Sequence, residues 1–427
     1  MFLDDELKLD KSKIHTLANY NFMETLNYCL QKSPFYINRL KNIDLSEITC
    51  IDDITKLPFT TKDDLANNTG DFLAVNGSEI VEITTTSGTT GNPLISKLTN
   101  SDLQRLAHNE FLSFSCTGLN SSDTVLLAVT MDKCFIAGLA YYIGLNKIGA
   151  ATLRIGPTSP EMLLRMAKTT GATAIVGVPS YLIRAYDYAL SSGFNVDDLK
   201  ISKLILIGES IRNRDFTLNS LGKKLQERWG CDLFSTYGIT ELQASFCECE
   251  KGAGGHLHPE LLHVEIVDDD GNIVPNGTVG EVVATTFGIS AMPLLRFKTG
   301  DMSFIIDEKC ACGRETLRLA PIVGRAKQRL KLKGTSVYPQ AIVNTLESID
   351  YVTDFVMVAT SEGEMSDRLE VNIALSAGSD DKLDSIKMKL QGNLKVTPDV
   401  KIMTAADVDA LKSSVSDRKK TRFIDKR

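Results

Sequence analysis

One stretch of the chain combines residue types that can bind phosphate. Residues 84–93 read Thr-Thr-Thr-Ser-Gly-Thr-Thr-Gly-Asn-Pro and follow the β-prone segment 81–83. Glycines let backbone N–H groups approach an anion closely, and the hydroxyls of serine and threonine add donors with little bulk. The stretch is not a Walker A loop, because no Gly-Lys-Ser/Thr sequence closes it. We expect a strand that runs into a phosphate-binding loop; a surface turn rich in threonine and glycine is the alternative.

A second set of residues has the composition of a zinc site, with two ligands at each end of the segment 249–312. Three cysteines and one histidine suit tetrahedral structural Zn²⁺, and a Cys-x-Cys pair can supply two ligands from one turn. The separation of roughly 50 residues is long for a compact zinc finger, so isolated free cysteines are the alternative. Cys247 and His258 are substitutes. The four predicted ligands are Cys249, His256, Cys310 and Cys312.

The elements that must position these residues show two kinds of pattern in the first 230 residues. Helical patterning occurs around 15–30, and a second helix is expected after Thr60 and Thr61, either of which could cap it. Residues 1–80 are therefore predicted to form a helical cover. The apolar runs 125–129, 172–178 and 204–207 are each short and are separated by helical patterns. This alternation predicts βαβ crossovers and largely parallel sheets.

The pattern changes towards the C-terminal end. Residues 260–320 alternate in polarity and are rich in turns, which predicts a β-rich subdomain of hairpins. Beyond Gly324 the sequence has the pattern of a compact α+β unit and ends in a basic tail at 417–422. We expect a domain boundary near Lys327.

Composition limits the classes of function. A chain of 427 residues exceeds one typical hydrophobic core. Its net charge of −7 argues against a general nucleic-acid binder, and no apolar run approaches the roughly 18 to 20 residues of a membrane span. The N-terminal sequence lacks a basic region before an apolar one, so we expect a cytoplasmic protein. Nine cysteines, an odd number, favour free thiols or metal ligands over a disulfide framework.

The phosphate-loop sequence carries a family resemblance. Ser87-Gly-Thr-Thr-Gly-Asn-Pro93 resembles the phosphate loop of the adenylate-forming superfamily of acyl- and aryl-CoA synthetases, adenylation domains and luciferases, and segments 33–36 and 57–65 resemble its phenylacetate–CoA ligase branch. Many members have a lysine beside the proline, whereas this chain has Asn92 and Leu94, with Lys97 the nearest cation. The resemblance covers nearly the whole chain. It implies an α/β fold with a large N-terminal domain of mainly parallel sheets, helices and a β-rich part (1–326), and a small mobile α+β C-terminal domain (327–427).

The resemblance also implies roles for residues of the N-terminal domain. Tyr237 would lie near adenine, Gly238 would approach the acyl group, Thr240 would contact phosphate, Glu241 would hold Mg²⁺ and Asp301 would accept hydrogen bonds from the ribose hydroxyls. Read only as structure, 237–240 is a strand that runs into a turn, and 297–301 is a turn that closes a hairpin. The acyl pocket would include Phe135, Ile136 and Gly138. The other implied nucleotide-binding residues are Thr86, Ser87, Gly88, Thr89, Thr90, Gly91, Gly208, Glu209 and Ser210.

Further roles fall on the C-terminal part. Segment 324–339 resembles the hinge region, in which Arg325 would contact ribose or phosphate, Lys327 would be the pivot and Gly334 would lie near the pantetheine route. The tail resembles the end of the branch that carries the catalytic lysine, which aligns with Lys419. Lys420 is adjacent to it and is an alternative, and a solvated basic tail is the purely structural reading.

The reaction implied by the resemblance is activation of a carboxylic acid by ATP with Mg²⁺, followed by transfer to coenzyme A. The default acid is an aryl or arylacetic acid such as phenylacetate. Three alternatives stay open: loading of an acyl or aminoacyl group onto an acyl carrier protein, transfer of AMP to a cofactor as in coenzyme F390 synthetase, and non-catalytic sensing of a nucleotide. A homodimer is also left open, and zinc would be structural because all its ligands come from the protein.

Overall fold

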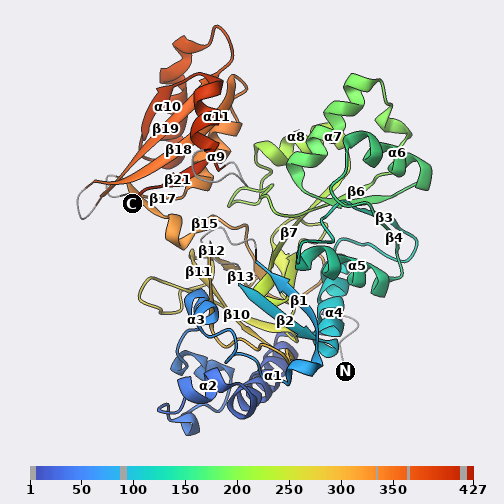
Figure 1. The fold of residues 1–427 in the computed structure, drawn as a ribbon, viewed down its shortest axis with the longest axis vertical. Helices are drawn as coiled ribbons and strands as arrows, with labels where there is room; N and C mark the ends of the chain where they lie inside the picture. The colour runs from blue at the N-terminus through green and yellow to red at the C-terminus, as the bar shows by residue number, and fades with distance from the viewer. Residues whose placement is uncertain (1–5, 87–93, 333–334, 363–365, 414–420) are drawn as a thin grey trace. The chain divides into compact units, whose positions relative to one another are not determined.

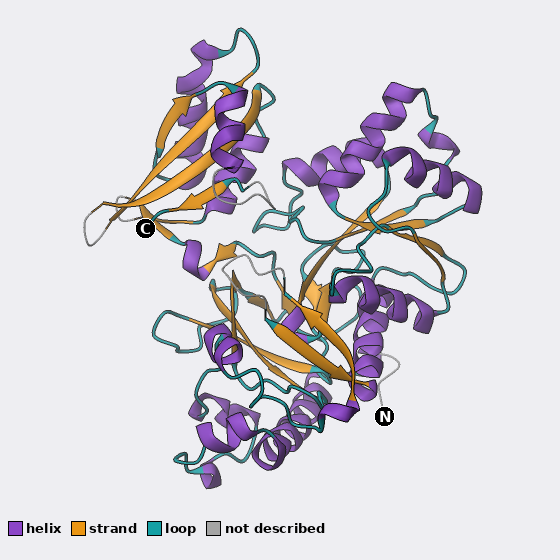
Figure 2. Cartoon of the chain, viewed as in Figure 1, coloured by secondary structure: helices purple, strands orange, loops and turns teal. Residues whose placement is uncertain are grey.

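A computed structural model describes residues 6–86, 94–332, 335–362, 366–413 and 421–427. The chain divides into two compact units, of which the first comprises Met1–Leu218, Gly222–Thr299 and Ser303–Pro321. The second comprises Asn219–Leu221, Gly300–Met302 and Ile322–Arg427. Figures 1 and 2 show the helices and strands of each. The functional division at Lys327 stays a prediction.

The N-terminal part of the first unit is helical, in agreement with the patterning around 15–30. Asp10 accepts a hydrogen bond from the backbone of Lys13 and caps the first long helix. Thr61 caps α3 in a capping box with Asp64, which confirms one of the two predicted caps. The elements are η1 (Glu6–Lys8), α1 (Lys11–Lys32), α2 (Pro34–Arg39), η2 (Leu45–Glu47), η3 (Ile51–Lys56), α3 (Lys62–Asn67) and η4 (Gly77–Glu79).

The central sheet of the first unit has six strands in the order β4-β3-β5-β6-β7-β8. Strands β3 to β7 are parallel to one another, as predicted, and β8 is antiparallel to β7. The strands are β3 (Thr124–Leu127), β4 (Ala151–Arg154), β5 (Ala174–Gly177), β6 (Lys203–Leu206), β7 (Asp232–Ile239) and β8 (Ala244–Cys247). The helices that accompany them are α4 (Asn100–Cys116), α5 (Ile136–Ile148), α6 (Pro160–Thr170), α7 (Pro179–Ser192) and α8 (Ser220–Trp229), with η5 (Val196–Asp198) and η6 (Thr240–Leu242).

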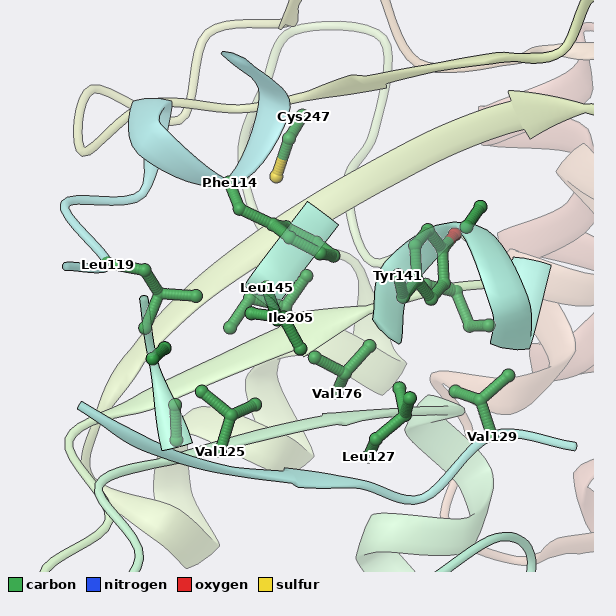
Figure 3. Close-up of a cluster of buried hydrophobic side chains, with 14 of the residues drawn as sticks. Phe114, Leu119, Val125, Leu127, Val129, Tyr141, Leu145, Val176, Ile205 and Cys247 are labelled. Carbon is green, nitrogen blue, oxygen red and sulfur yellow. The ribbon is translucent and has the colours of Figure 1, made fainter. Parts of the chain in front are cut away.

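Both faces of this sheet are buried. Successive strand residues point to opposite faces, so Val125 and Leu127 pack with α4 and α5, whereas Leu126 packs with α6, α7 and α8. Figure 3 shows the first of these clusters, in which Phe114 and Tyr141 lie over the strand side chains. Burial on both faces explains why these strands read as short, continuous apolar runs.

Helix α4 carries a buried polar face against β8. The amide of Asn109 accepts from the Ser245 backbone N–H at 2.6 Å and donates to the Ser245 carbonyl at 3.3 Å. The Ser113 hydroxyl donates to the same carbonyl, and the Ser245 hydroxyl donates to the Glu110 carboxyl group. These contacts fix β8, and with it the neighbouring strand β7, relative to α4.

Glu110 makes stability depend on pH. Burial raises the pKa of Glu110 to about 8, and the hydrogen bond from Ser245 opposes this only in part. Because the folded-state pKa is above the unfolded value, the contribution of Glu110 to stability is complete below about pH 4.5 and is lost as the pH rises to about 8. The difference in free energy of unfolding between Glu110→Gln and wild type should therefore depend on pH. We expect it to shift in favour of the variant by about 2 kcal/mol when the pH is raised from 6 to 8.

Urea unfolding of both proteins at the two pH values measures this difference. Glu227→Gln, on the exposed side of α8, is the control and should track wild type at both values. A pH-independent difference between Glu110→Gln and wild type would show that Glu110 does not change its protonation there.

The remaining strands of the first unit form antiparallel pairs, as the turn-rich pattern predicted. The β10–β11 hairpin pairs Leu262 with Thr286 and continues to Val267 with Glu281. The prediction that residues 297–301 form a turn is wrong, because these residues lie within strand β12. The strands are β1 (Ile80–Thr85), β2 (Ile95–Thr99), β9 (Gly255–His256), β10 (Leu262–Val267), β11 (Gly280–Thr286), β13 (Ile305–Ile306), β14 (Arg318–Leu319) and β12 (Phe297–Ser303), whose middle residues Gly300–Met302 belong to the second unit.

The second unit is an α+β fold built on a sheet of order β20-β19-β18-β21. Helices α9 and α10 cover one face of the sheet and α11 covers the other. Its elements are β15 (Gly324–Arg325), η7 (Ala326–Gln328), β16 (Leu330–Leu332), β17 (Thr335–Val337), α9 (Pro339–Glu347), β18 (Val352–Glu362), β19 (Ser366–Leu375), η8 (Asp380–Lys382), α10 (Leu383–Leu394), β20 (Asp399–Ile402), α11 (Ala405–Ser413) and β21 (Phe423–Asp425). Among the helices in the described ranges, none has the length and apolar character needed to cross a membrane.

Candidate active site and metal centre

The two ends of the predicted phosphate loop are joined by a strand pair. Strands β1 and β2 are antiparallel, and Thr85 pairs with Ile95. Beyond that pair, the Thr86 N–H donates to the Leu94 carbonyl at 2.9 Å, and the Leu94 N–H donates to the Thr86 hydroxyl at 3.0 Å. The predicted strand before the loop is therefore confirmed. Five of the predicted loop residues lie outside the described part of the chain: Ser87, Gly88, Thr89, Thr90 and Gly91.

Strand β7 carries the motif 235–241 to the end of the parallel sheet. Tyr237 and Gly238 lie near the end of the strand, and Thr240 and Glu241 lie in the helical turn η6 that follows. Gly238 pairs with Ser245 of β8, and a Cβ atom at Gly238 would lie 3.2 Å from the Ser245 Cβ, so a side chain there would require β8 to shift by a few tenths of an ångström. Carboxyl ends of parallel strands are common places for ligands in α/β folds.

Glu241 and the phosphate-loop ends line one small pocket. The Glu241 side chain is 6% exposed, and its Oε1 lies 3.6 Å from the Nζ of Lys62 on α3. The lining residues come from α3, both loop ends, η6 and the segment before β12: Leu65, Thr86, Leu94, Ile95, Ser96, Glu241, Met292 and Leu294. A predicted metal-binding carboxylate and the predicted phosphate loop are thus brought together.

Arg105 holds the chain just after Glu241. Its buried guanidinium donates to the carbonyl groups of Gln243 at 2.9 Å, of Leu261 at 2.6 Å and of Phe287 at 2.6 Å. Gln243 has a positive φ of 48°, which turns the chain from η6 into β8. Arg105 of α4 therefore fixes this turn, and the turn sets the direction of the chain at Glu241.

The residues predicted around the adenine site follow β6, as expected. Gly208 has a φ of +77°, which turns the chain out of the sheet. Glu209 accepts hydrogen bonds from the backbone N–H and the hydroxyl of Ser180, both at 2.8 Å, at the start of α7. The Ser210 hydroxyl donates to the Arg212 carbonyl at 3.1 Å. Glu209 and Ser210 therefore shape this loop, and their contacts with a nucleotide stay predictions.

The predicted acyl-pocket residues lie at the start of α5 and differ in exposure. Phe135 is 39% exposed, whereas Ile136 is buried in the core cluster with α4. A Cβ atom at Gly138 would lie 2.1 Å from the Thr130 carbonyl oxygen, so glycine permits close packing of α5 on that loop. Of the three, Phe135 is the side chain available to a ligand.

Asp301 and Arg325 form an ion pair in the second unit. They are opposite each other in the β12–β15 pairing, and the Arg325 Nε lies 3.2 Å from the Asp301 Oδ1. Asp301 is buried and Arg325 is more than half exposed. The family resemblance assigns both residues to one nucleotide, but nothing in the sequence indicates that they pair.

The predicted pivot Lys327 lies in the helical turn η7. Its carbonyl accepts a hydrogen bond from the Arg427 guanidinium at 3.0 Å, and the Arg329 carbonyl accepts another at 2.8 Å. The predicted pantetheine residue Gly334 and the two candidate catalytic lysines, Lys419 and Lys420, lie outside the described residues.

The four predicted zinc ligands form one cluster in the first unit. Their ligand atoms all lie within 4.8 Å of one another. Cys249 follows β8, His256 is in β9, and Cys310 and Cys312 lie in the turn between β13 and β14, where Gly313 has a φ of +97°. The Sγ atoms of Cys249 and Cys310 are 3.6 Å apart, and the Cys312 Sγ is 3.5 Å from the His256 Nε2. Three thiols and an imidazole at these distances are a donor set suited to tetrahedral Zn²⁺.

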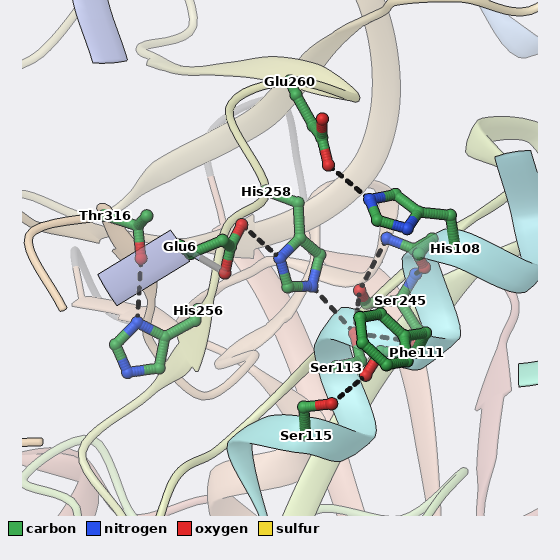
Figure 4. A network of polar contacts seen from close by, with 11 residues as sticks. Glu6, His108, Phe111, Ser113, Ser115, Ser245, His256, His258, Glu260 and Thr316 are labelled. Carbon is green, nitrogen blue, oxygen red and sulfur yellow. Dashed lines mark hydrogen bonds and ion pairs between the residues drawn. The ribbon is translucent and has the colours of Figure 1, made fainter. Parts of the chain in front are cut away.

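The surroundings of the cluster favour metal ligation. Burial lowers the pKa of His256 to about 3, which keeps the imidazole neutral, and its Nδ1 bonds the Thr316 hydroxyl at 2.9 Å and leaves Nε2 for a metal (Figure 4). Burial would raise the pKa of Cys312, but hydrogen bonds from the Arg314 backbone and side chain outweigh burial and lower it. Burial raises the pKa of Cys249 to about 12, so a thiolate there needs a bound cation.

The two substitute ligands have other partners. The ring nitrogens of His258 bond Glu6 and Ser113, both at 2.9 Å, as Figure 4 shows. Cys247 accepts from the Thr236 hydroxyl at 3.3 Å and belongs to the core cluster of Figure 3. Neither is in the four-residue cluster.

A buried ion pair connects the Cys/His cluster to β7. Glu248, next to Cys249, accepts from the Arg212 Nε at 2.8 Å and from the Ser235 backbone N–H at 3.0 Å. The Glu248 N–H donates in turn to the Ser235 carbonyl at 3.1 Å. Lys62, Arg212 and Glu248 are not predicted from the sequence. Each takes part in an ion pair between segments distant in the chain, and such a pair leaves no local sequence pattern.

Comparison with known protein families supports a nucleotide site. The model of the family described as AMP-binding enzyme matches residues 35–291, and the model of the AMP-binding enzyme C-terminal domain matches residues 334–427. The first match covers more than half of the chain and includes both ends of the phosphate loop and Glu241.

Individual relatives are similar over most of their length. The phenylacetate–coenzyme A ligase of Thermus thermophilus is 28% identical over 385 residues, which cover 88% of this chain and 85% of the relative. The enzyme of the same name from Pseudomonas putida is 25% identical over 376 residues, 86% of this chain and 83% of the relative. A crystal structure of 2-hydroxyisobutyryl-CoA ligase in the postadenylation state with R3-HIB-AMP has a TM-score of 0.84 at 19% identity, and the match covers 100% of this chain and 94% of that one.

Proposed function

The chain belongs to the AMP-binding enzyme family, and from that premise we propose that it is an ATP-dependent, AMP-forming acid–CoA ligase. The observation that carries the proposal is the pocket that Glu241 shares with Thr86 and Leu94, the two ends of the phosphate loop. A carboxylate for Mg²⁺ and a loop for phosphate are the two parts that a site for magnesium-bound ATP requires.

The reaction has two steps. A carboxylate oxygen of the acid attacks the α-phosphorus of ATP, an acyl–AMP bond forms and pyrophosphate leaves. The sulfur of coenzyme A then attacks the acyl carbon, the thioester forms, and AMP leaves with the electron pair of the acyl–oxygen bond while the thiol proton goes to solvent. Positioning and neutralisation of negative charge dominate the first step, because the protein has little covalent chemistry to perform.

Roles for the chain's own residues follow from this reaction. Thr86 and the loop that it begins would hold the phosphates, Thr240 would donate a hydrogen bond to phosphate, and Glu241 would hold Mg²⁺, which neutralises charge as pyrophosphate departs. Asp301 would accept hydrogen bonds from the ribose hydroxyls. Tyr237 would pack near adenine, since its ring is part-exposed at the end of β7.

The acid that we propose is an aryl or arylacetic acid, with phenylacetate as the first candidate. The similar curated proteins from Thermus thermophilus and Pseudomonas putida are phenylacetate–coenzyme A ligases, which supports this class. The partly exposed Phe135 ring at the start of α5 is suited to pack against an aromatic acid.

Acid-dependent exchange of labelled pyrophosphate into ATP tests the first step. We expect exchange with phenylacetate or a related aryl acid and no exchange without acid, and we expect a CoA thioester when coenzyme A is added. Absence of exchange with a broad panel of acids, in protein that still binds ATP, would refute the ligase. Transfer to a carrier protein or an adenylylated cofactor, in place of a thioester, would identify a different acceptor.

We also propose that Cys249, His256, Cys310 and Cys312 bind a structural Zn²⁺. All four donors come from the protein and no position is left for substrate, so the ion would stabilise the fold. We expect purified protein to contain one zinc ion per chain, and Cys249→Ala to lose the ion and to lower Tm by several degrees. Elemental analysis and thermal unfolding measure both effects.

Cys247→Ala is the matched control for zinc binding, because it removes a buried thiol two residues away. It should keep its zinc. Equal zinc content in Cys249→Ala and wild type would show that the cluster is a group of free thiols.

A further inference from the structure

The predicted phosphate loop carries no full positive charge. From Thr84 to Ser96 the sequence contains no lysine or arginine. Hydroxyl and backbone N–H groups can bind a triphosphate, but the β- and γ-phosphates carry most of its negative charge and are normally met by a cation as well as by Mg²⁺. If ATP binds here, the cation has to come from another part of the chain.

Lys62 is a cation that contacts a carboxylate lining this pocket. Its Nζ lies 3.6 Å from the Oε1 of Glu241, which lines the pocket together with Thr86 and Leu94. Leu65, one turn later on α3, lines the pocket as well. The Lys62 side chain is 36% exposed and that of Glu241 is 6% exposed, so the pair joins a part-exposed ammonium group to a buried carboxylate.

The backbone that carries Lys62 is anchored. The Thr60 hydroxyl donates to the Leu295 carbonyl at 2.7 Å, and its backbone N–H donates to the Arg296 carbonyl at 3.0 Å. The next residue, Thr61, forms the capping box that starts α3. The backbone at the start of α3 is therefore anchored, and the Lys62 side chain extends from it to Glu241 at the pocket.

We propose that Lys62 binds the β- and γ-phosphates of ATP and supplies the charge that the phosphate loop lacks. This inference rests on the proposed function in placing ATP in this pocket. Without nucleotide, Lys62 neutralises Glu241. With magnesium-bound ATP present, Glu241 would hold the Mg²⁺ and the Lys62 ammonium group would bind the terminal phosphates. Each charge exchanges one partner for another, so neither is left unpaired in a part-buried pocket.

Comparison of ATP and AMP binding tests this role, because AMP lacks the phosphates that Lys62 would contact. We expect Lys62→Met to weaken ATP binding by about 10- to 100-fold, the loss of a hydrogen bond between charged groups, and to change AMP binding by no more than about twofold. Lys62→Arg keeps the charge and should retain most of the ATP affinity. Isothermal titration with Mg²⁺ present measures both affinities.

Lys56→Met is the matched control. Lys56 is 42% exposed and pairs with Asp53 at 3.0 Å, so this variant also breaks an exposed lysine–carboxylate pair, but Asp53, unlike Glu241, does not line the pocket. It should bind ATP and AMP as wild type does. An equal loss of both ligands in Lys62→Met, or no loss of ATP, would overturn the proposal, because a purely structural lysine would not distinguish the two nucleotides.

Lys97 on β2 is the rival cation, since it is the nearest lysine after the loop in sequence. Loss of ATP affinity in Lys97→Met but not in Lys62→Met would assign the role to Lys97 and overturn our proposal. These titrations need no acid or coenzyme A. Failure of acid-dependent exchange in wild type would refute the ligase, whereas the role of Lys62 is decided by the difference between ATP and AMP.

Discussion

Replacement of Glu241 by glutamine is expected to lower the rate of acid-dependent pyrophosphate–ATP exchange by about 100- to 1000-fold. Glutamine keeps the size of the side chain and removes its negative charge, so the proposed Mg²⁺ site would lose a hard oxygen ligand. Weaker binding of the ion would leave the charge on the departing pyrophosphate less well compensated. We expect the Mg²⁺ concentration at half-maximal rate to rise as well.

The effect of Glu241→Gln can be separated from misfolding. The Glu241 side chain pairs with Lys62 at 3.6 Å and makes no other ion pair among the described residues, so the variant should unfold within a few degrees of wild type. Glu227→Gln on α8 makes the same chemical change at an exposed position and should leave exchange unchanged. An exchange rate in Glu241→Gln within a few-fold of wild type would remove Glu241 from the metal site.

Lys419→Ala is expected to abolish adenylation but spare thioester formation from supplied acyl adenylate. An ammonium group can bridge the carboxylate and the α-phosphate oxygens while charge shifts between them, and loss of such a group costs about 100- to 1000-fold in rate. The second step starts from a finished acyl–AMP and has no use for that bridge. Pyrophosphate exchange measures the first step, and thioester formation from chemically prepared acyl adenylate measures the second.

Lys420→Ala is the matched variant for this experiment, because it removes the neighbouring ammonium group from the same tail. It should adenylate at a rate near that of wild type. If Lys420→Ala alone loses exchange, the catalytic role belongs to Lys420. Loss of both steps in Lys419→Ala would refute a role limited to adenylation.

The strands and caps of the first unit could be predicted because their signals are local. The runs around Val125, Ala174 and Leu204 are apolar on both faces, as strands between two helix layers must be. Thr61 and Asp64 are three residues apart, which is the spacing of a capping box. The reading of 297–301 as a turn failed for the opposite reason: Gly300 and Asp301 favour turns locally, but strand pairing in β12 overrides that preference.

The four residues of the Cys/His cluster could be predicted as a set but not chosen uniquely. The spacing of Cys310 and Cys312 indicates one turn with two ligands, whereas Cys247 and His258 differed from Cys249 and His256 only by two places in the chain. The choice depended on which side chains face the turn between β13 and β14, and that is decided by pairing with β9. The contact of Lys62 with Glu241 likewise joins segments that only the folded chain brings together.

The bond between Ser235 and Glu248 has a consequence for amide hydrogen exchange. The Ser235 amide proton is held by a carboxylate whose own residue adjoins Cys249, so it exchanges with solvent only when that connection opens. Ser235 begins the segment that carries Tyr237 and Glu241. Its exchange rate therefore reports, at a single residue of β7, whether the hydrogen bond to Glu248 beside the Cys/His cluster is intact.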